Sequence, residues 1–114
     1  MLFGNKLAKV EKLAQKGKAD KLKDFVYDKK QDVRLAAIDG LGKCKGEVAF
    51  NTLSTLINDP DANIRLHVVK AIGATGDPKT RAFLEHRRDA EKDAKVLAAI
   101  GEACKGASSM KTST

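Results

Sequence analysis

Residues 58–78 read NDPDANIRLHVVKAIGATGDP and hold the signals for one complete helix and for the start of the next. Asp61 is the predicted N-cap, because its side chain can accept hydrogen bonds from the free amide groups of a first helical turn. Gly73–Gly76 supplies the stop, because glycine tolerates the left-handed conformation found at helix ends. Asp77 and Pro78 then open a second helix, since proline fits the first helical position. Between these signals the apolar residues recur at helical spacing: Ile64, Val68, Ala71 and Ile72.

The same signals recur along the chain with a period close to 31 residues. Residues 33–35 (Val-Arg-Leu) are matched at an offset of 31 by residues 64–66 (Ile-Arg-Leu), and the string Leu-Ala-Ala-Ile at 35–38 returns at 97–100. Such a series of matches at one period indicates internal repeats. No segment shows the alternation with period two that is typical of strands. The prediction is three helix pairs and one unpaired helix, over residues 5–15, 19–27, 32–41, 47–58, 62–72, 78–88 and 93–104.

Composition and charge exclude several classes of protein. The chain has 114 residues, of which 42% are apolar and 32% charged, and this suits one folded domain rather than a disordered chain. No apolar run approaches the roughly 18 residues of a membrane-spanning helix, and two cysteines are too few for a disulfide-stapled secreted domain. We therefore expect a cytoplasmic protein, with a repeat domain over residues 1–105 and a mobile polar tail over residues 106–114.

The repeat unit resembles HEAT-like repeats, of the short bacterial type found in phycobilisome lyase-like proteins. The resemblance covers about residues 6–106 and is carried by residues 58–65, 71–73 and 76–78, with further matches at 32–34 and 41–42. It implies an all-α fold, namely a right-handed α-solenoid of about three and a half helix pairs. In such folds each repeat buries its apolar face against its neighbours, so the core is a strip. Because such repeats serve many unrelated tasks, function has to be argued from the surface.

The resemblance also implies roles at the repeat junctions. Arg34 and Arg65 occupy equivalent positions and are expected to pair with acidic residues there, with Asp28 and Asp59 as the candidates. Ligand contact is the alternative role for the two arginines. Small residues on the first helices should let those helices pack closely: Ala36, Ala37, Ala98 and Ala99.

The second helix of each pair lines the concave surface in HEAT-like solenoids. The positions outside the core on these helices are therefore the predicted partner-binding residues. The competing interpretation is an ordinary solvated face with a local Arg81–Glu85 pair. The predicted residues are Asn51, Thr55 and Asn58 on one helix, and Arg81, Glu85 and Arg88 on the next.

The sequence offers no catalytic residue set, metal site or cofactor motif. It has no nucleophile elbow, phosphate loop or paired carboxylates. His67 and His86 stand on different helices without a carboxylate at ligand spacing, so we expect a half-buried His67 and no metal. Cys44 and Cys104 lie in equivalent turns two repeats apart, about 20 Å at the usual spacing of packed helices. That distance is too long for a disulfide, so both should be reduced thiols.

Positive charge gathers at the N-terminal end of the chain. Residues 1–31 hold nine lysines and four acidic residues, and so carry +5 of the total net charge of +7. Four lysines share about a third of the circumference of the first helix and could attract a phosphate backbone. The same residues can equally form a solvated face, and base-stacking aromatic residues are missing between them. These lysines are Lys6, Lys9, Lys12 and Lys16.

Two function hypotheses follow. The first is a non-catalytic protein–protein interaction module that binds a partner on the concave face. The alternative is a nucleic-acid-binding solenoid that uses the lysine stripe. The helix at 93–104 is apolar nearly all round although no second helix follows it. We therefore expect an under-covered face there, which either pairs with a second copy of the chain or is covered by the tail through Met110.

Overall fold

A computed structural model describes residues 5–112 of the chain, with side chains for residues 6–107. Within this part the chain forms helices and turns and no strand, as the sequence predicts. The second helix of the first pair is short and continues as the 3₁₀ turn η1. The elements are α1 (Asn5–Gln15), α2 (Ala19–Leu22), η1 (Lys23–Phe25), α3 (Gln31–Gly42), α4 (Glu47–Thr55), α5 (Ala62–Thr75), α6 (Thr80–Arg88) and α7 (Ala94–Thr112).

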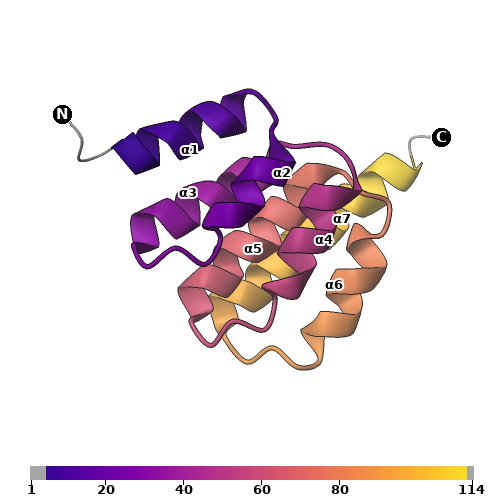
Figure 1. Cartoon of the computed structure of the whole chain (residues 1–114). Coiled ribbons are helices and arrows are strands. Elements are labelled where there is room, and N and C mark those ends of the chain that lie inside the picture. Colours follow the sequence, from indigo (N-terminus) through magenta and orange to yellow (C-terminus); the bar gives the residue numbers. More distant parts are fainter. Residues whose placement is uncertain (1–4, 113–114) are drawn as a thin grey trace.

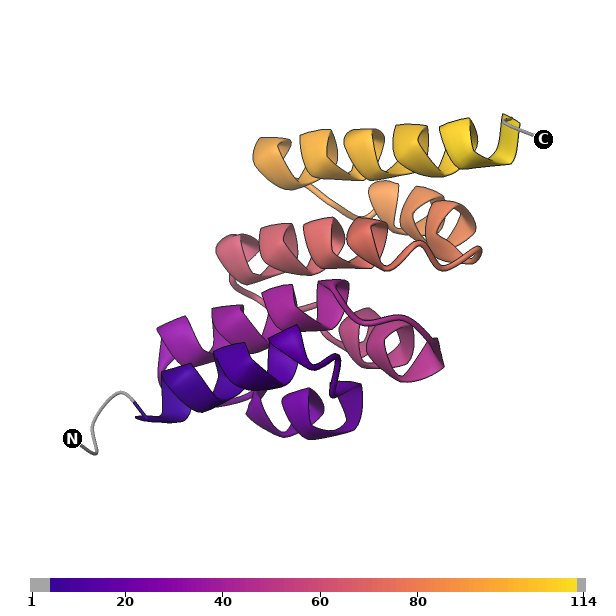
Figure 2. The same ribbon diagram turned by 90° about the horizontal axis from the view of Figure 1, so that it is seen from above.

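The helices form two layers (Figures 1 and 2). The first helices α1, α3, α5 and α7 lie side by side in one layer, where each contacts the next. The second helices α2, α4 and α6 form the other layer, which we call the B layer. Figure 2 shows α7 at one edge of the first layer, with no helix beyond it. This is an α-solenoid of about three and a half repeats.

The core is a strip between the layers, as predicted for stacked repeats. Leu22, Leu53 and Leu84 each belong to a different second helix, and all three side chains are fully buried. They are spaced by the 31-residue period, so one sequence position of the repeat supplies a core residue from each helix of the B layer. The first helices supply other fully buried side chains to the same strip, namely Ile38, Ile64, Val68, Ile72, Val96 and Ile100.

Glycine, more than alanine, sets the close approach of the first helices. A Cβ atom added at Gly42 on α3 would lie 2.9 Å from the Cα atom of Ala71 on α5, and one added at Gly73 would lie 3.0 Å from the Cβ atom of Ala103. Of the predicted spacer residues, Ala37 is fully buried and Ala98 is exposed. Ala99 is buried as well and Ala36 packs against the core, so Ala98 is the one predicted small residue that stays exposed, and Gly42 and Gly73 are close-approach positions that the prediction did not include.

The predicted ends of the first helices α1, α3 and α5 agree with the structure within a few residues, whereas the second helices are shorter than predicted: α2 ends at Leu22, α4 ends at Thr55 and α6 begins at Thr80 rather than at Pro78. Asp61 caps α5 by accepting a hydrogen bond from the Asn63 amide at 2.8 Å. Gly17, Gly46 and Gly76 take positive φ angles of 67°, 103° and 70° where a first helix gives way to a second. Gly106, the next glycine in the series, lies inside α7.

The C-terminal boundary requires a correction. The sequence predicts an end of the last helix at residue 104 and a polar tail over 106–114. The backbone of α7 instead stays helical to Thr112, and Gly106 lies within the helix rather than in a turn. Met110 lies outside the described side chains, so its predicted covering role stays a prediction, as does the mobility of the tail.

Candidate binding surfaces

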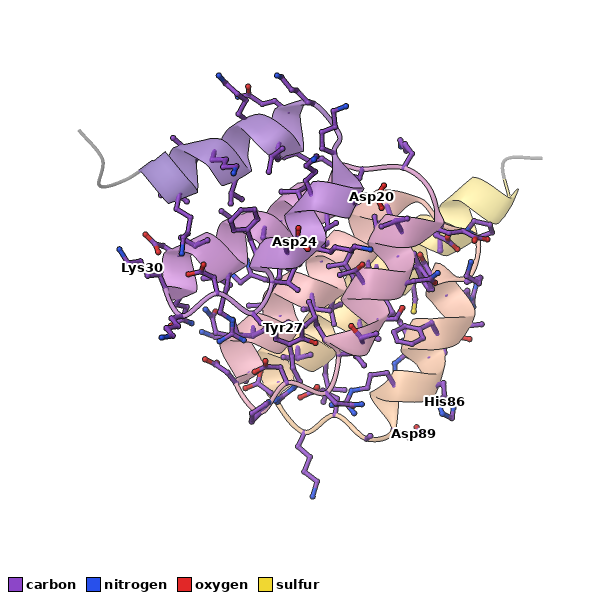
Figure 3. The ribbon with its side chains drawn as sticks, in the orientation of Figure 1. Asp20, Asp24, Tyr27, Lys30, His86 and Asp89 are labelled. Atoms are coloured by element: carbon purple, nitrogen blue, oxygen red, sulfur yellow. The ribbon has the colours of Figure 1, made fainter. Side chains whose placement is uncertain are left out.

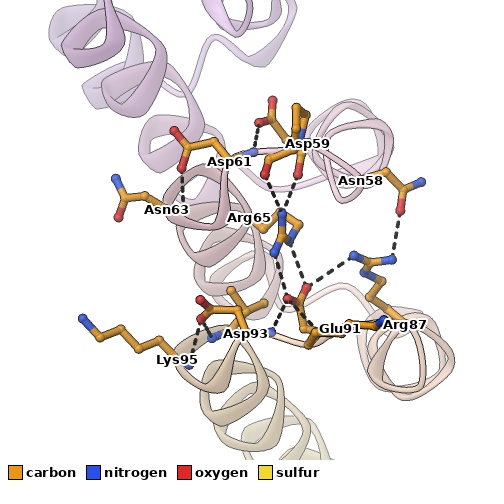
Figure 4. Close-up of polar contacts among 12 residues, drawn as sticks. Asn58, Asp59, Asp61, Asn63, Arg65, Arg87, Glu91, Asp93 and Lys95 are labelled. Atoms are coloured by element: carbon orange, nitrogen blue, oxygen red, sulfur yellow. Dashed lines mark hydrogen bonds and ion pairs between the residues drawn. The ribbon is translucent and has the colours of Figure 1, made fainter.

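Glu91, in the turn between α6 and α7, is the one charged residue buried in the described part of the chain. Its carboxylate accepts hydrogen bonds from Nε and Nη2 of Arg65 on α5, both at 3.0 Å. Nη2 of Arg87 on α6 donates a further hydrogen bond at 3.3 Å, and the Asp93 amide donates another at 3.0 Å (Figure 4). One carboxylate therefore ties together α5, α6 and the start of α7.

Electrostatics keep this contact fully ionised. The hydrogen bond from Arg65 lowers the pKa of Glu91 from 4.5 to about 2, although burial opposes the shift. The same bond raises the pKa of Arg65. Arg65 also donates through Nη1 to the carbonyl oxygens of Asp59 at 2.8 Å and Pro60 at 3.1 Å. Its guanidinium is thus saturated by the fold, which leaves it little capacity for a ligand.

Two further contacts repeat this arrangement at the earlier junctions. Nη2 of Arg34 lies 3.0 Å from Oδ2 of Asp59, and Nζ of Lys6 lies 2.8 Å from Oδ2 of Asp28. With Arg65–Glu91 they form what we call the junction ladder, in which a cation on a first helix reaches the acid that precedes the next first helix. The predicted pairing of the two arginines with junction acids is therefore confirmed for Arg34 and Asp59. The partners of Arg65 and Asp28 were missed.

A one-residue shift explains why the sequence did not indicate Glu91. Asp28 and Asp59 are 31 residues apart, and the next step of that period falls on Ala90. The turn before α7 places its acid one position later. A search for acidic residues within one position of the period would have found it.

The predicted partner-binding residues on α4 and in the turn after it fall into two groups. Asn51 and Thr55 lie on the exposed outer side of the helix. Asn58 instead turns toward α6, where its Oδ1 atom accepts a hydrogen bond from Nη1 of Arg87 at 3.0 Å. Between the two helices the rings of Phe50 and Phe83 meet edge to face, with centroids 5.7 Å apart. The gap between α4 and α6 is therefore filled.

The three predicted residues on α6 lie on a different side of the molecule. Arg81 and Glu85 pair with each other at 2.9 Å. Arg81 also lines a pocket with Ala107 of α7, so it lies on the side of α6 that faces α7. The structure therefore does not bring them into one patch with Asn51 and Thr55. The 31-residue period assigns the equivalent positions on α6 to Ala82, His86 and Asp89, all exposed.

The B layer also exposes large apolar groups that the sequence reasoning did not single out. Tyr27, directly after η1, is 69% exposed, and Val48 on α4 is 38% exposed. Among the described residues these are the two large hydrophobic side chains left in solvent. Figure 3 shows Tyr27 on the face of α2 and η1 together with Asp20 and Asp24, and His86 and Asp89 at the end of α6.

The lysine stripe on α1 is partly committed to the domain itself. All four lysines are exposed. Lys6 forms the first contact of the junction ladder, and the Lys9 ammonium lies 6.0 Å from the centroid of the Phe25 ring. Lys12 and Lys16 are the members of the stripe that face solvent without such a contact among the described residues.

The histidines and cysteines have local structural surroundings. His67 is half-buried, as predicted, and its Nδ1 atom lies 2.9 Å from Oδ1 of Asp39 on α3. Both cysteines are free and buried, as predicted, and burial raises the pKa of the Cys44 thiol. Over the described residues no group of three or more metal-ligating side chains comes together.

A groove of about 640 Å³ runs between α5 and α7 on the side away from the B layer. Its walls are mostly apolar and include Leu66, Ala74, Ala98 and Ala99, and its charged residues are Lys70, Lys95 and Glu102. The under-covered face predicted for the last helix exposes fewer apolar side chains than expected. Ile100 is fully buried and Leu97 is half-buried, so Ala98 is the apolar residue left exposed between them.

No helix in the described part of the chain combines the length and apolar character needed to cross a membrane. A search of curated proteins gives no match. A family model for HEAT repeats matches residues 19–105, which is most of the chain and runs from α2 into α7. That match agrees with the paired helices, the strip-like core and the junction ladder. The chain belongs to the HEAT repeat family.

Proposed function

We propose that the protein is a non-catalytic interaction module that binds a partner protein through the outer face of the B layer. This B-layer face consists of Tyr27, Val48, Asn51 and Thr55, and extends onto α6 through His86. The observation that carries the proposal is the exposure of Tyr27 and Val48, both on this layer. Tyrosine is enriched at protein interfaces because it offers a large, rigid contact surface with a polar tip.

The family and the chemistry of the surface support the same conclusion. HEAT repeats generally mediate protein–protein interaction. Glu91, the buried carboxylate of the described residues, accepts hydrogen bonds from Arg65 and Arg87 inside the fold, so it is not accessible to a substrate. Both cysteines are free thiols, which supports a reducing compartment such as the cytoplasm.

The alternative partner, nucleic acid, rests on fewer residues than the sequence indicates. Lys6 and Lys9 contact the domain itself, so the stripe depends on Lys12 and Lys16. Binding of duplex or single-stranded DNA at low salt, weakened by a joint Lys12→Glu and Lys16→Glu change, would favour this alternative. A loss of binding that follows the lysines would also overturn the B-layer proposal.

A pair of amide-to-arginine substitutions tests the B-layer face. Asn51→Arg places a new charge on the face, and Gln15→Arg makes the same change at an exposed position at the end of α1. We expect a partner captured by the wild type from native lysate to be lost with Asn51→Arg and with Tyr27→Ala, and retained with Gln15→Arg. Equal capture by all variants would place the interaction elsewhere on the domain. Turnover that survives the loss of partner binding would contradict a non-catalytic role.

A further inference from the structure

The groove between α5 and α7 lies next to α7, which stands at one edge of the first layer, as α1 does at the other. Lys95, Ala98 and Glu102 of α7 are all exposed and line this groove. Among the described residues neither Lys95 nor Glu102 has an ion-pair partner within the chain, whereas the charged residues of the junction ladder are paired. The groove therefore offers apolar surface together with three charged residues, Lys70 on α5 and Lys95 and Glu102 on α7, and the two on α7 have opposite signs.

These two charges have a self-complementary arrangement. Lys95 and Glu102 are seven residues apart, close to two helical turns, so they lie on nearly the same side of α7. Ala98 and Ala99 lie midway between them. Read in the opposite direction, the segment 95–102 keeps its small apolar centre and exchanges its positive and negative ends. A second copy of the same helix in antiparallel orientation therefore presents the complementary charge at each end.

We propose that the α5–α7 groove is the interface of a symmetric dimer in which the α7 helices of two copies pack antiparallel about Ala98 and Ala99. Lys95 of each copy then faces Glu102 of the other, which gives two reciprocal ion pairs. A two-fold interface requires one surface patch to complement itself, and this face has that property. Alanine at the crossing point allows helix axes to approach to about 8 Å.

The size of the interface defines which surfaces must take part. A standard stable interface buries about 800 Å² per partner, and one helix ridge supplies only part of that area. The α5 wall of the groove, with Leu66 and Ala74, supplies further apolar surface next to α7. The B-layer face lies on the opposite side, so it remains accessible in both copies. The dimer would present two partner sites and could bind a repeated partner by avidity. The proposal does not depend on the proposed function.

Charge exchange between the two positions tests the dimer. Sedimentation equilibrium over the micromolar range should show mass doubling for the wild type. Lys95→Glu and Glu102→Lys should each weaken dimerisation by at least about tenfold, since each brings like charges together. The variant that carries both substitutions restores opposite charges across the two-fold axis and should dimerise within about threefold of the wild type.

Two controls separate this interface from general charge effects. Lys92→Glu makes the same charge change at an exposed position outside the groove and should leave the dimer unchanged. Ala98→Glu puts charge at the crossing point and should give a folded monomer, with folding checked by circular dichroism. A wild type that stays monomeric at hundreds of micromolar overturns the proposal. A dimer that survives the single substitutions, or is not restored in the double variant, also overturns it.

Discussion

The two ends of the junction ladder use the same contact in opposite environments. At the C-terminal end, Arg65 and Glu91 form two hydrogen bonds, and the glutamate side chain is 1% exposed. At the N-terminal end, Lys6 and Asp28 form one contact, and the lysine side chain is 55% exposed. In both contacts a cation on a first helix meets the acid that precedes the next first helix, so the signs of the charges are the same. Burial and the number of donors are what differ.

This difference predicts where the ladder matters for stability. A surface ion pair contributes little, because water and salt screen the charges and long side chains lose entropy when they are held. A buried pair is costly to break from one side, because the remaining charge is left without a partner in a poorly hydrated site. The last junction should therefore be sensitive to substitution and the first junction tolerant, although both have the same architecture.

The largest expected effect comes from Glu91→Ala. It leaves the guanidinium groups of Arg65 and Arg87 without their shared acceptor, and should lower the free energy of unfolding by about 3–5 kcal/mol. Glu85→Ala is the matched control, since Glu85 also pairs with an arginine but its side chain is 44% exposed. That substitution should cost less than about 1 kcal/mol. Equal losses in urea denaturation would show that burial does not separate the two contacts.

Acidification should weaken the Arg65–Glu91 contact by protonating Glu91, without a substitution at either residue. The pKa of Glu91 is about 2 in the folded protein against 4.5 ordinarily. The unfolded chain therefore binds more protons in this window, and stability falls as the pH drops from about 4.5 toward 2. The loss should reach about 3 kcal/mol. It is best measured as the difference in unfolding free energy between wild type and Glu91→Gln. That difference should shrink across the window, and a constant difference would contradict the assignment.

The sequence was sufficient for the repeat architecture because its signals are local. Asp61, Gly76 and the 31-residue spacing of Leu22, Leu53 and Leu84 are visible without knowledge of the packing. The ladder was only partly visible, because pairing depends on turn length, and one extra residue in the last junction moved the acid from the expected position to Glu91.

The candidate surface was harder to predict because it depends on which side of a helix faces its neighbour. The residues predicted on α6, namely Arg81, Glu85 and Arg88, stand one position before those that the 31-residue period assigns. Tyr27 gave no periodic signal, since it stands just after η1. The end of α7 was misplaced because Gly106 continues the spacing of the glycines that follow the other first helices, although it lies inside α7.

A comparison of two glycines sharpens the contrast between crowded and open parts of the first layer. Gly42→Ala introduces a Cβ atom 2.9 Å from the Ala71 backbone and should cost about 1–3 kcal/mol. A Cβ atom at Gly101 on α7 meets nothing within 4 Å, so Gly101→Ala should stabilise the helix by roughly 0.5–1 kcal/mol. Thermal unfolding of both variants measures the pair. If Gly101→Ala lowered the stability, a neighbouring group would have to lie close to position 101 of α7 in solution.

The smallest effect on stability should come from Lys6→Ala at the N-terminal end of the ladder, with no resolvable change in the unfolding midpoint. The contact can still be detected through its partner. The hydrogen bond from Lys6 is the main cause that lowers the pKa of Asp28 below 3.8, and the backbone amide of Lys30 is the second. Without Lys6 the amide remains, 2.9 Å from Oδ1, so the pKa of Asp28 should rise without reaching that of a free carboxyl. Titration of the Asp28 carboxyl signal by NMR measures this, and added salt should shift the wild type the same way. An unchanged pKa would show that the first ladder contact is not formed in solution.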